Sequence, residues 1–328
     1  MKIGNKLRHL LGDQNIIVKI ASSLINEGFC LISLFSPSLN CRLRHRYIYG
    51  KKLNIKNPQT FIEKCNWYKV KVVNKHEIFR TCSDKYAVRE YVKAQGCGDI
   101  LNQLIAVYDS VDEIDWDILP EQFVIKLNDG CGYYLICTDK NNFDIDDAKR
   151  KLKKWWGEHQ YLLYAEMQNK ATKRRVLIEK YIHGPNGSKQ PIDYKVYCFH
   201  GVPVAVLCVW DRDSQMKELF MTADWQFISA AYSPDYKVKG ENGGSLPPKP
   251  WSLDDMIMYA SKLSAPFPFV RCDFYQTDDG PIFGELTFTA AGGMFTAQTD
   301  PKVLDMSQLF HVPCKFEDFD IYFRNGEI

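Results

Sequence analysis

The fold is decided by two stretches in the last third of the chain, Phe269-Val270-Arg271-Cys272-Asp273-Phe274-Tyr275 and Pro281-Ile282-Phe283-Gly284-Glu285-Leu286-Thr287, separated by Thr277-Asp278-Asp279-Gly280. Both stretches alternate with period two and are rich in β-branched and aromatic residues. With an Asp-Gly turn between them, this pattern predicts a β-hairpin. The hairpin places four polar side chains on one face: Arg271, Asp273, Glu285 and Thr287.

An arginine, two acids and a hydroxyl are costly on a half-buried sheet face unless they hold something charged. Two carboxylates at facing positions suit Mg²⁺, which takes one or two protein carboxylates together with phosphate oxygens, and an arginine can clamp a phosphate. The face therefore fits a metal-bound polyphosphate. The alternative is an ordinary salt-bridged strand pair on a solvated face.

Composition sets the broad class of the protein. The chain has 328 residues, 45% hydrophobic and 25% charged, which is typical of one large or two to three small globular domains. The 42 Lys and Arg against 40 Asp and Glu leave a net charge of +2, so the composition does not indicate nucleic-acid binding. Basic clusters at 149–154 and 170–175 are interpreted as a solvated helix face and a loop before a strand.

The eleven cysteines are scattered, with no Cys-x-x-Cys pair, so neither a zinc site nor a disulfide framework is indicated. We therefore expect a reducing, cytoplasmic compartment. The apolar run from Ile16 to Phe35 is interrupted by polar residues and is expected to form an amphipathic helix packed on the domain, without a signal peptide. A basic stretch follows, which is compatible with peripheral attachment to an anionic membrane surface; it contains Arg42, Arg44, His45 and Arg46.

Cap residues predict several helices. Thr60 and Glu63 form a capping box for a helix from 61 to about 71. A second helix is expected over 83–92, capped by Ser83 or Asp84, and others over 144–159 and 253–263. In the second helix Lys85 would lie in the first turn, where a cation either points outward or binds an anion.

Strands are expected at 104–108, 122–127, 133–137, 175–182, 193–199 and 202–210. The second of them ends in Lys126-Leu127 and is followed by the loop Asn128-Asp129-Gly130-Cys131-Gly132. Because its glycines let backbone N–H groups approach a ligand closely, this loop is compatible with a phosphate cradle, although it is neither a Walker A motif nor Gly-x-Gly-x-x-Gly. A simple hairpin turn is the alternative.

Together these pieces resemble a known superfamily. In order along the chain stand Asp84-Lys85, Val124-Ile125-Lys126 with its glycine loop, Glu179-Lys180-Tyr181-Ile182, Arg271-x-Asp273, and Glu285-x-Thr287 followed by Gly292-Gly293-Met294. This order is similar to that of the ATP-grasp superfamily. A closer resemblance, from about Tyr49 to Phe310, is to the TupA-like branch named for teichuronopeptide biosynthesis. It is carried by Lys52-Leu53-Asn54, Asn57-Pro58-x-Thr60-Phe61, Asp84-Lys85-Tyr86-Ala87-Val88-Arg89, Leu119-Pro120-x-x-Phe123-Val124-x-Lys126 and Gly284-Glu285-Leu286-Thr287-Phe288.

The resemblance implies roles for individual residues. Lys85 and Lys126 would hold the phosphates of ATP, the loop with Asn128, Gly130 and Gly132 would close over them, and Glu179, Lys180, Tyr181 and Ile182 would line the adenine. Arg271 would steady the transferred phosphate, and Asp273 and Glu285, expected to be exposed in the cleft, would hold Mg²⁺. Thr287 stands at the third metal position, where asparagine is usual, and Asn186 stands where related branches carry an acid for the ribose. Asp193 and Lys195 could reach substrate or the γ-phosphate, or form a surface ion pair.

The fold class that follows is α+β, with an ATP-grasp fold whose two lobes of antiparallel sheet grip ATP. We expect an N-terminal helical and small α/β region over 1–82, a nucleotide-gripping lobe over 83–182 and a C-terminal lobe over 183–328. The implied activity is an ADP-forming ligase that joins small-molecule carboxylate and amine substrates through an acyl phosphate. The branch suggests an amino acid and a uronic acid, or a peptide or sugar acceptor, in bacterial surface polysaccharide biosynthesis.

Other functions are open at this point. Asp-x-Asp motifs at Asp115, Asp211 and Asp318 are of the kind that hold the metal of a sugar nucleotide in glycosyltransferases. A nucleotide-binding module without catalysis is a third possibility. Cys131 could act as a nucleophile, but no base stands beside it in the sequence.

Overall fold

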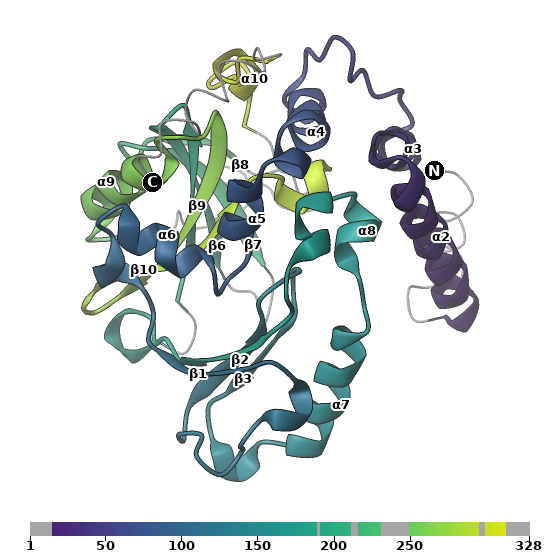
Figure 1. Cartoon of the computed structure of the whole chain (residues 1–328). Coiled ribbons are helices and arrows are strands. Elements are labelled where there is room, and N and C mark those ends of the chain that lie inside the picture. Colours follow the sequence, from purple (N-terminus) through teal and green to yellow (C-terminus); the bar gives the residue numbers. More distant parts are fainter. Residues whose placement is uncertain (1–14, 189–190, 211–215, 231–248, 295–298, 313–328) are drawn as a thin grey trace.

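The computed structural model describes residues 15–188, 191–210, 216–230, 249–294 and 299–312. Two antiparallel sheets lie at its centre (Figure 1). The four-stranded sheet has the order β1-β4-β2-β3, with β1 (Leu104–Tyr108), β4 (Val176–Lys180), β2 (Phe123–Leu127) and β3 (Tyr134–Cys137). The six-stranded sheet has the order β10-β9-β5-β6-β7-β8, with β10 (Gly280–Thr287), β9 (Phe269–Thr277), β5 (Asp193–Phe199), β6 (Val202–Trp210), β7 (Lys217–Thr222) and β8 (Phe227–Ala230).

Helices surround these sheets, and the helices α2 and α3 precede them in the chain and lie at one side of the molecule (Figure 1). The α+β fold class predicted from the sequence is confirmed. The helices of the described chain are α2 (Ile16–Phe35), α3 (Pro37–Tyr49), α4 (Phe61–Lys71), α5 (Glu77–Ser83), α6 (Val88–Ala94), α7 (Ile145–Trp156), α8 (Gln160–Tyr164), α9 (Leu253–Ser264) and α10 (Met306–Leu309).

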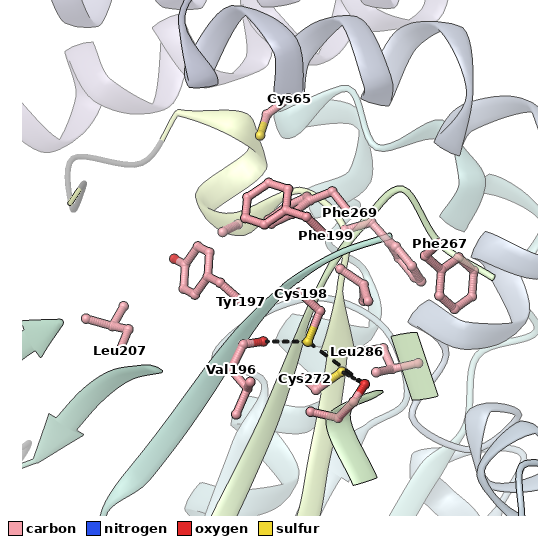
Figure 2. Close-up of a cluster of buried hydrophobic side chains, with 14 of the residues drawn as sticks. Cys65, Val196, Tyr197, Cys198, Phe199, Leu207, Phe267, Phe269, Cys272 and Leu286 are labelled. Atoms are coloured by element: carbon pink, nitrogen blue, oxygen red, sulfur yellow. Dashed lines mark hydrogen bonds between the residues drawn. The ribbon is translucent and has the colours of Figure 1, made fainter. Parts of the chain in front are cut away.

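The larger hydrophobic core lies between the six-stranded sheet and helices α4, α5, α6 and α9. Aromatic rings dominate it: the Phe269 ring lies 5.3 Å from that of Phe61 and 5.1 Å from that of Phe199. Figure 2 shows Phe199 and Phe269 close together above the buried thiols of Cys198 and Cys272. Because the side chains of this core are closely packed, the core rigidly supports the polar residues that the same sheet carries.

The smaller core belongs to the four-stranded sheet and α7, which lies beside that sheet in Figure 1. Phe123, Ile125 and Leu127 alternate inward along β2, so the residues between them, including Lys126, are the half-buried ones. Residues 83–100 pack with the larger core through Val88, Tyr91 and Val92. The expected domain boundaries at 82/83 and 182/183 stay predictions.

Local signals in the sequence are borne out in several places. The capping box is present, because the Thr60 side chain accepts a hydrogen bond from the Glu63 N–H and the Glu63 carboxylate accepts one from the Thr60 N–H. Asp144 caps α7, and α9 covers the segment expected to be helical. Strands β1, β5 and β6 have the expected bounds, whereas β7 and β8 were not anticipated.

The single helix expected over 83–92 is wrong. The segment instead contains the end of α5, a turn, and α6 beginning at Val88. The expected cap at Asp84 is confirmed, because its carboxylate accepts hydrogen bonds from the N–H groups of Tyr86 and Ala87 and also one from the side chain of Asn128. The residues directly after this cap form a turn, so Lys85 precedes the helix.

The hairpin predicted for the last third is present as β9 and β10. A register shift between Phe283 and Glu285 places Glu285 opposite Asp273 and Thr287 opposite Arg271. At the bulge, a Cβ atom on Gly284 would lie 3.1 Å from the Asp273 carbonyl oxygen, so glycine allows the strands to approach here. The bulge brings all four polar side chains to one face.

Candidate functional site

The polar face of the β9–β10 hairpin is a connected cluster. The Arg271 guanidinium donates two hydrogen bonds of 2.6 Å to the Asp273 carboxylate. The same guanidinium also donates to Thr287 Oγ1 at 3.1 Å and to Glu285 Oε1 at 3.4 Å. Thr287 in turn donates to Glu285 at 2.9 Å. The four residues picked from the sequence therefore do meet, and the predicted phosphate cation is bound to a predicted metal ligand.

Strand β5 adds two more residues to this cluster, because Lys195 lies opposite Asp273 in the sheet. The Lys195 ammonium lies 2.5 Å from Asp273 Oδ2 and 2.8 Å from Asp193 Oδ2. The ion pair of Lys195 with Asp193 that was considered from the sequence is present, but it is buried and not at the surface, since the Lys195 side chain is only 12% exposed. From the sequence, Asp273 was expected to be exposed in a cleft. This prediction is wrong, because Asp273 is buried. Glu285 is the more accessible acid, with 41% of its side chain exposed.

Electrostatics link this cluster to the glycine loop. Burial alone would raise the pKa of Glu285, but the positive charges of Lys85, Arg271 and Lys195 outweigh burial and hold that pKa at about 2. Of the three cations, Lys85 lowers this pKa most, and it belongs to the turn beside the glycine loop. Glu285 is therefore ionised at neutral pH, and the charges of three cations from separate segments favour its ionised form.

The glycine loop is tied to the turn that carries Lys85. The Lys85 ammonium donates to the Gly130 carbonyl at 2.7 Å, and the Lys85 N–H donates to the Asn128 carbonyl at 2.9 Å. The buried Asn128 side chain binds Asp84, the Lys173 carbonyl and the Arg175 N–H. Asn128 thus braces the loop with its side chain.

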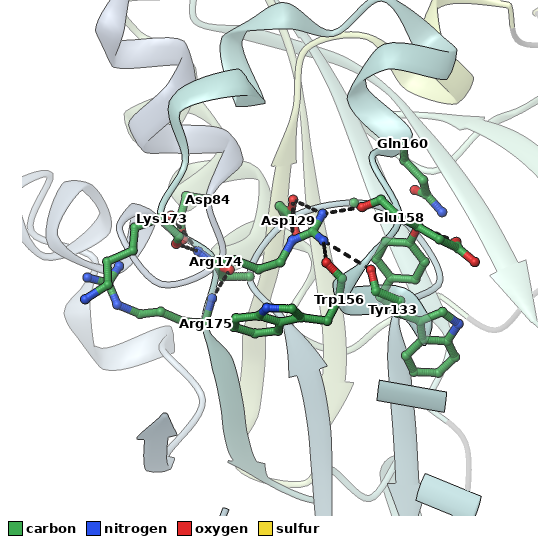
Figure 3. Close-up of polar contacts among 12 residues, drawn as sticks. Asp84, Asp129, Tyr133, Trp156, Glu158, Gln160, Lys173, Arg174 and Arg175 are labelled. Atoms are coloured by element: carbon green, nitrogen blue, oxygen red, sulfur yellow. Dashed lines mark hydrogen bonds and ion pairs between the residues drawn. The ribbon is translucent and has the colours of Figure 1, made fainter. Parts of the chain in front are cut away.

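A buried ion pair fixes the base of the loop (Figure 3). Arg174 donates to both oxygens of Asp129 at 2.8–3.2 Å and to the backbone carbonyls of Trp155, Trp156 and Glu158. The Arg174 side chain is only 12% exposed, although it lies in the loop before β4 that was expected from the sequence. Arg174 must be counted as part of the loop's scaffold.

The tip of the loop is held by Gln160 of α8, which was not anticipated from the sequence. Its side chain accepts a hydrogen bond from the Cys131 N–H at 2.8 Å and donates one to the Cys131 carbonyl at 3.0 Å. Burial raises the pKa of the Cys131 thiol, and the charge of Glu285 adds to this shift. The thiol is therefore protonated at neutral pH, which does not support a nucleophilic role.

The four-stranded sheet contributes a second polar group. Lys126 of β2 donates to Glu179 of β4 at 2.7 Å, and Asn102 donates to the Lys180 carbonyl at 2.9 Å and to Glu179 at 3.4 Å. Glu179 is buried, while the Lys180 side chain is exposed. The next two residues, expected beside an adenine, follow the strand end: Tyr181 is buried and Ile182 is half-buried.

Asn186 lies apart from the other predicted residues. Its backbone N–H donates to Asp278 at 2.9 Å, in the turn of the β9–β10 hairpin. Asp278 is five residues from Asp273, roughly 16 Å along an extended strand. The Asn186 side chain is exposed, at the turn end of the hairpin.

The donor chemistry of the hairpin fits Mg²⁺. Within the residues that the structure describes, no group of three or more His, Cys, Asp or Glu side chains is placed to hold a metal ion. Mg²⁺ does not require such a group, since it binds one or two carboxylates together with phosphate oxygens and water. Glu285 is ionised and accessible, and Thr287 Oγ1 lies beside it. Asp273 would join them only after its contacts with Arg271 and Lys195 open.

The turn after β10 is fixed by buried residues of α4, another feature that the sequence did not reveal. Lys69 is buried and donates to the carbonyls of Tyr164 and Gly292 at 2.8 and 2.6 Å. Nearby, Thr289 donates to Glu166 at 2.5 Å, and burial raises the pKa of Glu166. A lysine among the apolar positions of α4 was the available signal, because a buried lysine requires partners.

The Asp-x-Asp motif at Asp115 lies in the loop between β1 and β2, where Asp115 and Asp117 are both exposed. Asp115 accepts a hydrogen bond from the Asp117 N–H, which is a local turn contact. The motifs at Asp211 and Asp318 lie outside the described residues.

Comparisons with known proteins agree with this architecture. The model of the family described as TupA-like ATPgrasp matches residues 63–306, and no curated protein matches at a significant level. Among solved structures, a D-alanine–D-alanine ligase from Bacillus anthracis complexed with ATP is 17% identical, with a TM-score of 0.42 and coverage of 75% of this chain and 67% of that one.

The ATP-grasp ligase PsnB, complexed with its minimal precursor, Mg and ADP, is 11% identical, with a TM-score of 0.34 and coverage of 69% of this chain and 57% of that one. At such TM-scores these two likenesses say nothing about substrates. The family match covers most of the chain, and it includes the glycine loop, both sheets and the hairpin cluster. The chain therefore belongs to the TupA-like ATP-grasp family.

Proposed function

We propose that this protein is an ATP-dependent carboxylate–amine ligase that forms an amide bond through an acyl phosphate and releases ADP. The observation that carries the proposal is the hairpin cluster, in which the Arg271 guanidinium contacts Asp273, Glu285 and Thr287. Lys85, which is bonded to the glycine loop, adds a positive charge that lowers the pKa of Glu285. Such a group neutralises the charge of a phosphoryl group during transfer.

Two bond exchanges make up the proposed reaction. A carboxylate oxygen of the first substrate attacks the γ-phosphorus of ATP, and ADP leaves with the electrons of the broken P–O bond. The amine nitrogen of the second substrate then attacks the acyl carbon, loses a proton, and expels inorganic phosphate. Arg271 and Lys85 stabilise the charge on the transferred phosphoryl group. Asp273, Glu285 and Thr287 would hold Mg²⁺, which supplies further charge neutralisation.

The four-stranded sheet provides the other half of the nucleotide site in this proposal. Lys126 would exchange its contact with Glu179 for a phosphate oxygen, and the segment from Glu179 to Ile182 would lie against the adenine. Asn186 would reach the ribose only if the loop that carries it moves relative to the hairpin turn.

The substrates we propose follow from the family. An amino acid would be joined to a uronic acid, or to a peptide or sugar acceptor, during assembly of a bacterial surface polysaccharide such as a capsule. The reaction would take place in the cytoplasm, where ATP is available and thiols stay reduced.

ADP release tests the proposal directly. The purified chain is assayed with ATP and Mg²⁺ against a panel of amino acids, with and without uronic acids. We expect ADP to form only with a carboxylate present, and the rate to rise when the amine partner is added. Asp115→Asn with Asp117→Asn serves as a control that should keep full activity, whereas a requirement for these two acids and a sugar nucleotide would support the glycosyltransferase instead.

A further inference from the structure

Helix α2 exposes an unusually apolar face. Within the described residues it is the helix that is long and apolar enough to cross a membrane, and only 11% of its most apolar 18-residue window is buried. Large apolar patches on a soluble surface mark interaction sites. Seven large apolar side chains of α2 are each more than half exposed: Ile16, Ile17, Ile20, Leu24, Leu31, Leu34 and Phe35.

These seven residues share one side of the helix. With about 100° of rotation per residue, they fall within an arc of roughly 100°. The buried residues Val18, Phe29 and Ser33 lie on the opposite side. Glu27 lies within the exposed arc and accepts a hydrogen bond from Ser23 at 3.1 Å. A carboxylate on this face favours a helix lying in the headgroup region over one buried in hydrocarbon.

The opposite side of α2 is fastened to the protein body. Asn40 of α3 donates to the Phe29 carbonyl at 2.8 Å and to Ser33 at 2.7 Å, and it also reaches the Leu162 and Leu163 carbonyls of α8. The Arg44 guanidinium lies over the Phe29 and Tyr164 rings, 5.3 and 4.9 Å from their centres. These buried contacts hold α2 along the surface, with its apolar face outward.

Helix α3 presents positive charge beside that face. Its exposed stripe alternates Leu39 and Leu43 with Arg42 and Arg46, which is the pattern of a helix at an anionic membrane surface. An apolar groove of about 540 Å³ runs between α2 and α3, lined by residues that include Phe29, Leu43 and Arg46.

The charge of this part of the chain differs from that of the rest. The described residues 15–62 contain seven Lys and Arg and one acid, Glu27, so their net charge is +6, although the whole chain carries +2. A second copy of the chain would bring the same positive charge to this face and be repelled. An anionic lipid surface complements both the charge and the apolar side chains.

We propose that the α2–α3 face binds the surface of an anionic bilayer, with α2 lying in the plane of the headgroups and its apolar side chains inserted. The proposal goes beyond the ligase activity and does not depend on it. It also places α8, which holds the tip of the glycine loop through Gln160, directly behind the membrane-bound helix.

Sedimentation with vesicles tests this surface. The full chain is mixed with vesicles of phosphatidylcholine alone or of phosphatidylcholine with phosphatidylglycerol, at about 0.1 M salt, where the Debye length is roughly 10 Å. We expect binding to the anionic vesicles only, and weaker binding at about 1 M salt. Equal binding to both vesicle types, or no binding to either, would overturn the proposal.

Three variants separate the contributions. Leu31→Glu with Leu34→Glu should lower the partition coefficient at least tenfold, because the apolar face can no longer insert. Arg42→Gln with Arg46→Gln should lower it about thirtyfold on anionic vesicles, because each arginine near the surface contributes roughly a factor of five. A control of comparable exposure elsewhere, Ile118→Glu with Val202→Glu, should bind like the parent.

Other occupants of the face would give different results. If α2 closes a dimer, the parent sediments in solution as a dimer, Leu31→Glu with Leu34→Glu is monomeric, and vesicles are not bound. If α2 spans the bilayer, vesicle binding is unchanged at about 1 M salt and is also unchanged when Arg42 and Arg46 are replaced. Either result contradicts the proposal. Circular dichroism checks that each variant is folded. If the leucine variant does not fold, the arginine variant still decides between the outcomes.

Discussion

Arg271 holds Asp273 through two hydrogen bonds of 2.6 Å across the polar face of the β9–β10 hairpin. One of these residues was expected to contact phosphate and the other Mg²⁺. In the structure each satisfies the other, and Lys195 adds a third contact to Asp273 at 2.5 Å.

Replacing the two acids should separate stability from activity. Asp273→Asn removes the buried carboxylate that Arg271 and Lys195 share and should lower the free energy of unfolding by about 3–5 kcal/mol, although Glu285 and Asp193 remain beside them. Glu285→Gln, at a side chain 41% exposed, should cost about 1 kcal/mol or less. Both variants should lose ATP turnover. Urea denaturation and an ADP assay measure the two effects, and turnover near the parent level in either variant at saturating Mg²⁺ argues against the metal site.

The pKa of Glu285 predicts a specific acid dependence. Its folded-state pKa of about 2 lies below the ordinary 4.5, so this carboxylate stabilises the fold above about pH 4.5 and loses that contribution as the pH falls toward 2. In Glu285→Gln this part of the acid sensitivity should disappear. Unfolding free energies of parent and variant are compared from pH 6 to 2. A constant difference between them over that range would show that the Glu285 pKa is not depressed.

Lys126 and Lys85 should each contribute to nucleotide affinity. Loss of one charge-assisted hydrogen bond to phosphate is worth about 2 kcal/mol, so Lys126→Met and Lys85→Met should each weaken ATP binding roughly thirtyfold. Lys126→Met also leaves Glu179 buried without its cation, and adding Glu179→Gln should recover stability but not affinity. Calorimetry measures the affinity. Unchanged affinity in both single variants would mean that the glycine loop is only a turn.

Two glycines of the loop provide a matched pair of substitutions. Both have positive φ, +75° at Gly130 and +78° at Gly132, so alanine costs about 1 kcal/mol of backbone strain at either position. At Gly130 the new Cβ would also lie 2.7 Å from the Tyr133 ring, whereas at Gly132 it meets nothing within 4 Å. Gly130→Ala should therefore lower the melting temperature more than Gly132→Ala. Equal effects would show that Tyr133 moves aside freely.

Much of the fold could be predicted from local patterns. The hairpin, the capping box at Thr60 and strands β1, β5 and β6 all depend on alternation or short-range hydrogen bonds within a few residues. The order of motifs also identified the family. The helix expected over 83–92 shows the limit of this approach. Its cap at Asp84 was identified correctly, but the turn that follows is bonded to Asn128, 44 positions from Asp84, and that contact leaves no local signal.

The site was only partly predictable for the same reason. Arg271, Asp273, Glu285 and Thr287 could be placed on one face because strand alternation fixes their direction. The residues that hold the glycine loop in place could not be predicted, since Gln160 and Arg174 bond to the loop from 29 and 45 residues away in the sequence. The exposure of Asp273 was misjudged because period-two alternation does not show that β5 covers it with Lys195.

The most direct test of the proposed chemistry is to trap the activated acyl group. The protein is incubated with ATP, Mg²⁺ and a carboxylate substrate found in the ADP assay, with hydroxylamine in place of the amine, and nucleotides and hydroxamate are quantified together. An acyl phosphate made beside Arg271 and Glu285 predicts ADP and hydroxamate in equal amounts, both absent in Glu285→Gln. AMP with pyrophosphate, or ADP formed equally well without any carboxylate, would contradict it.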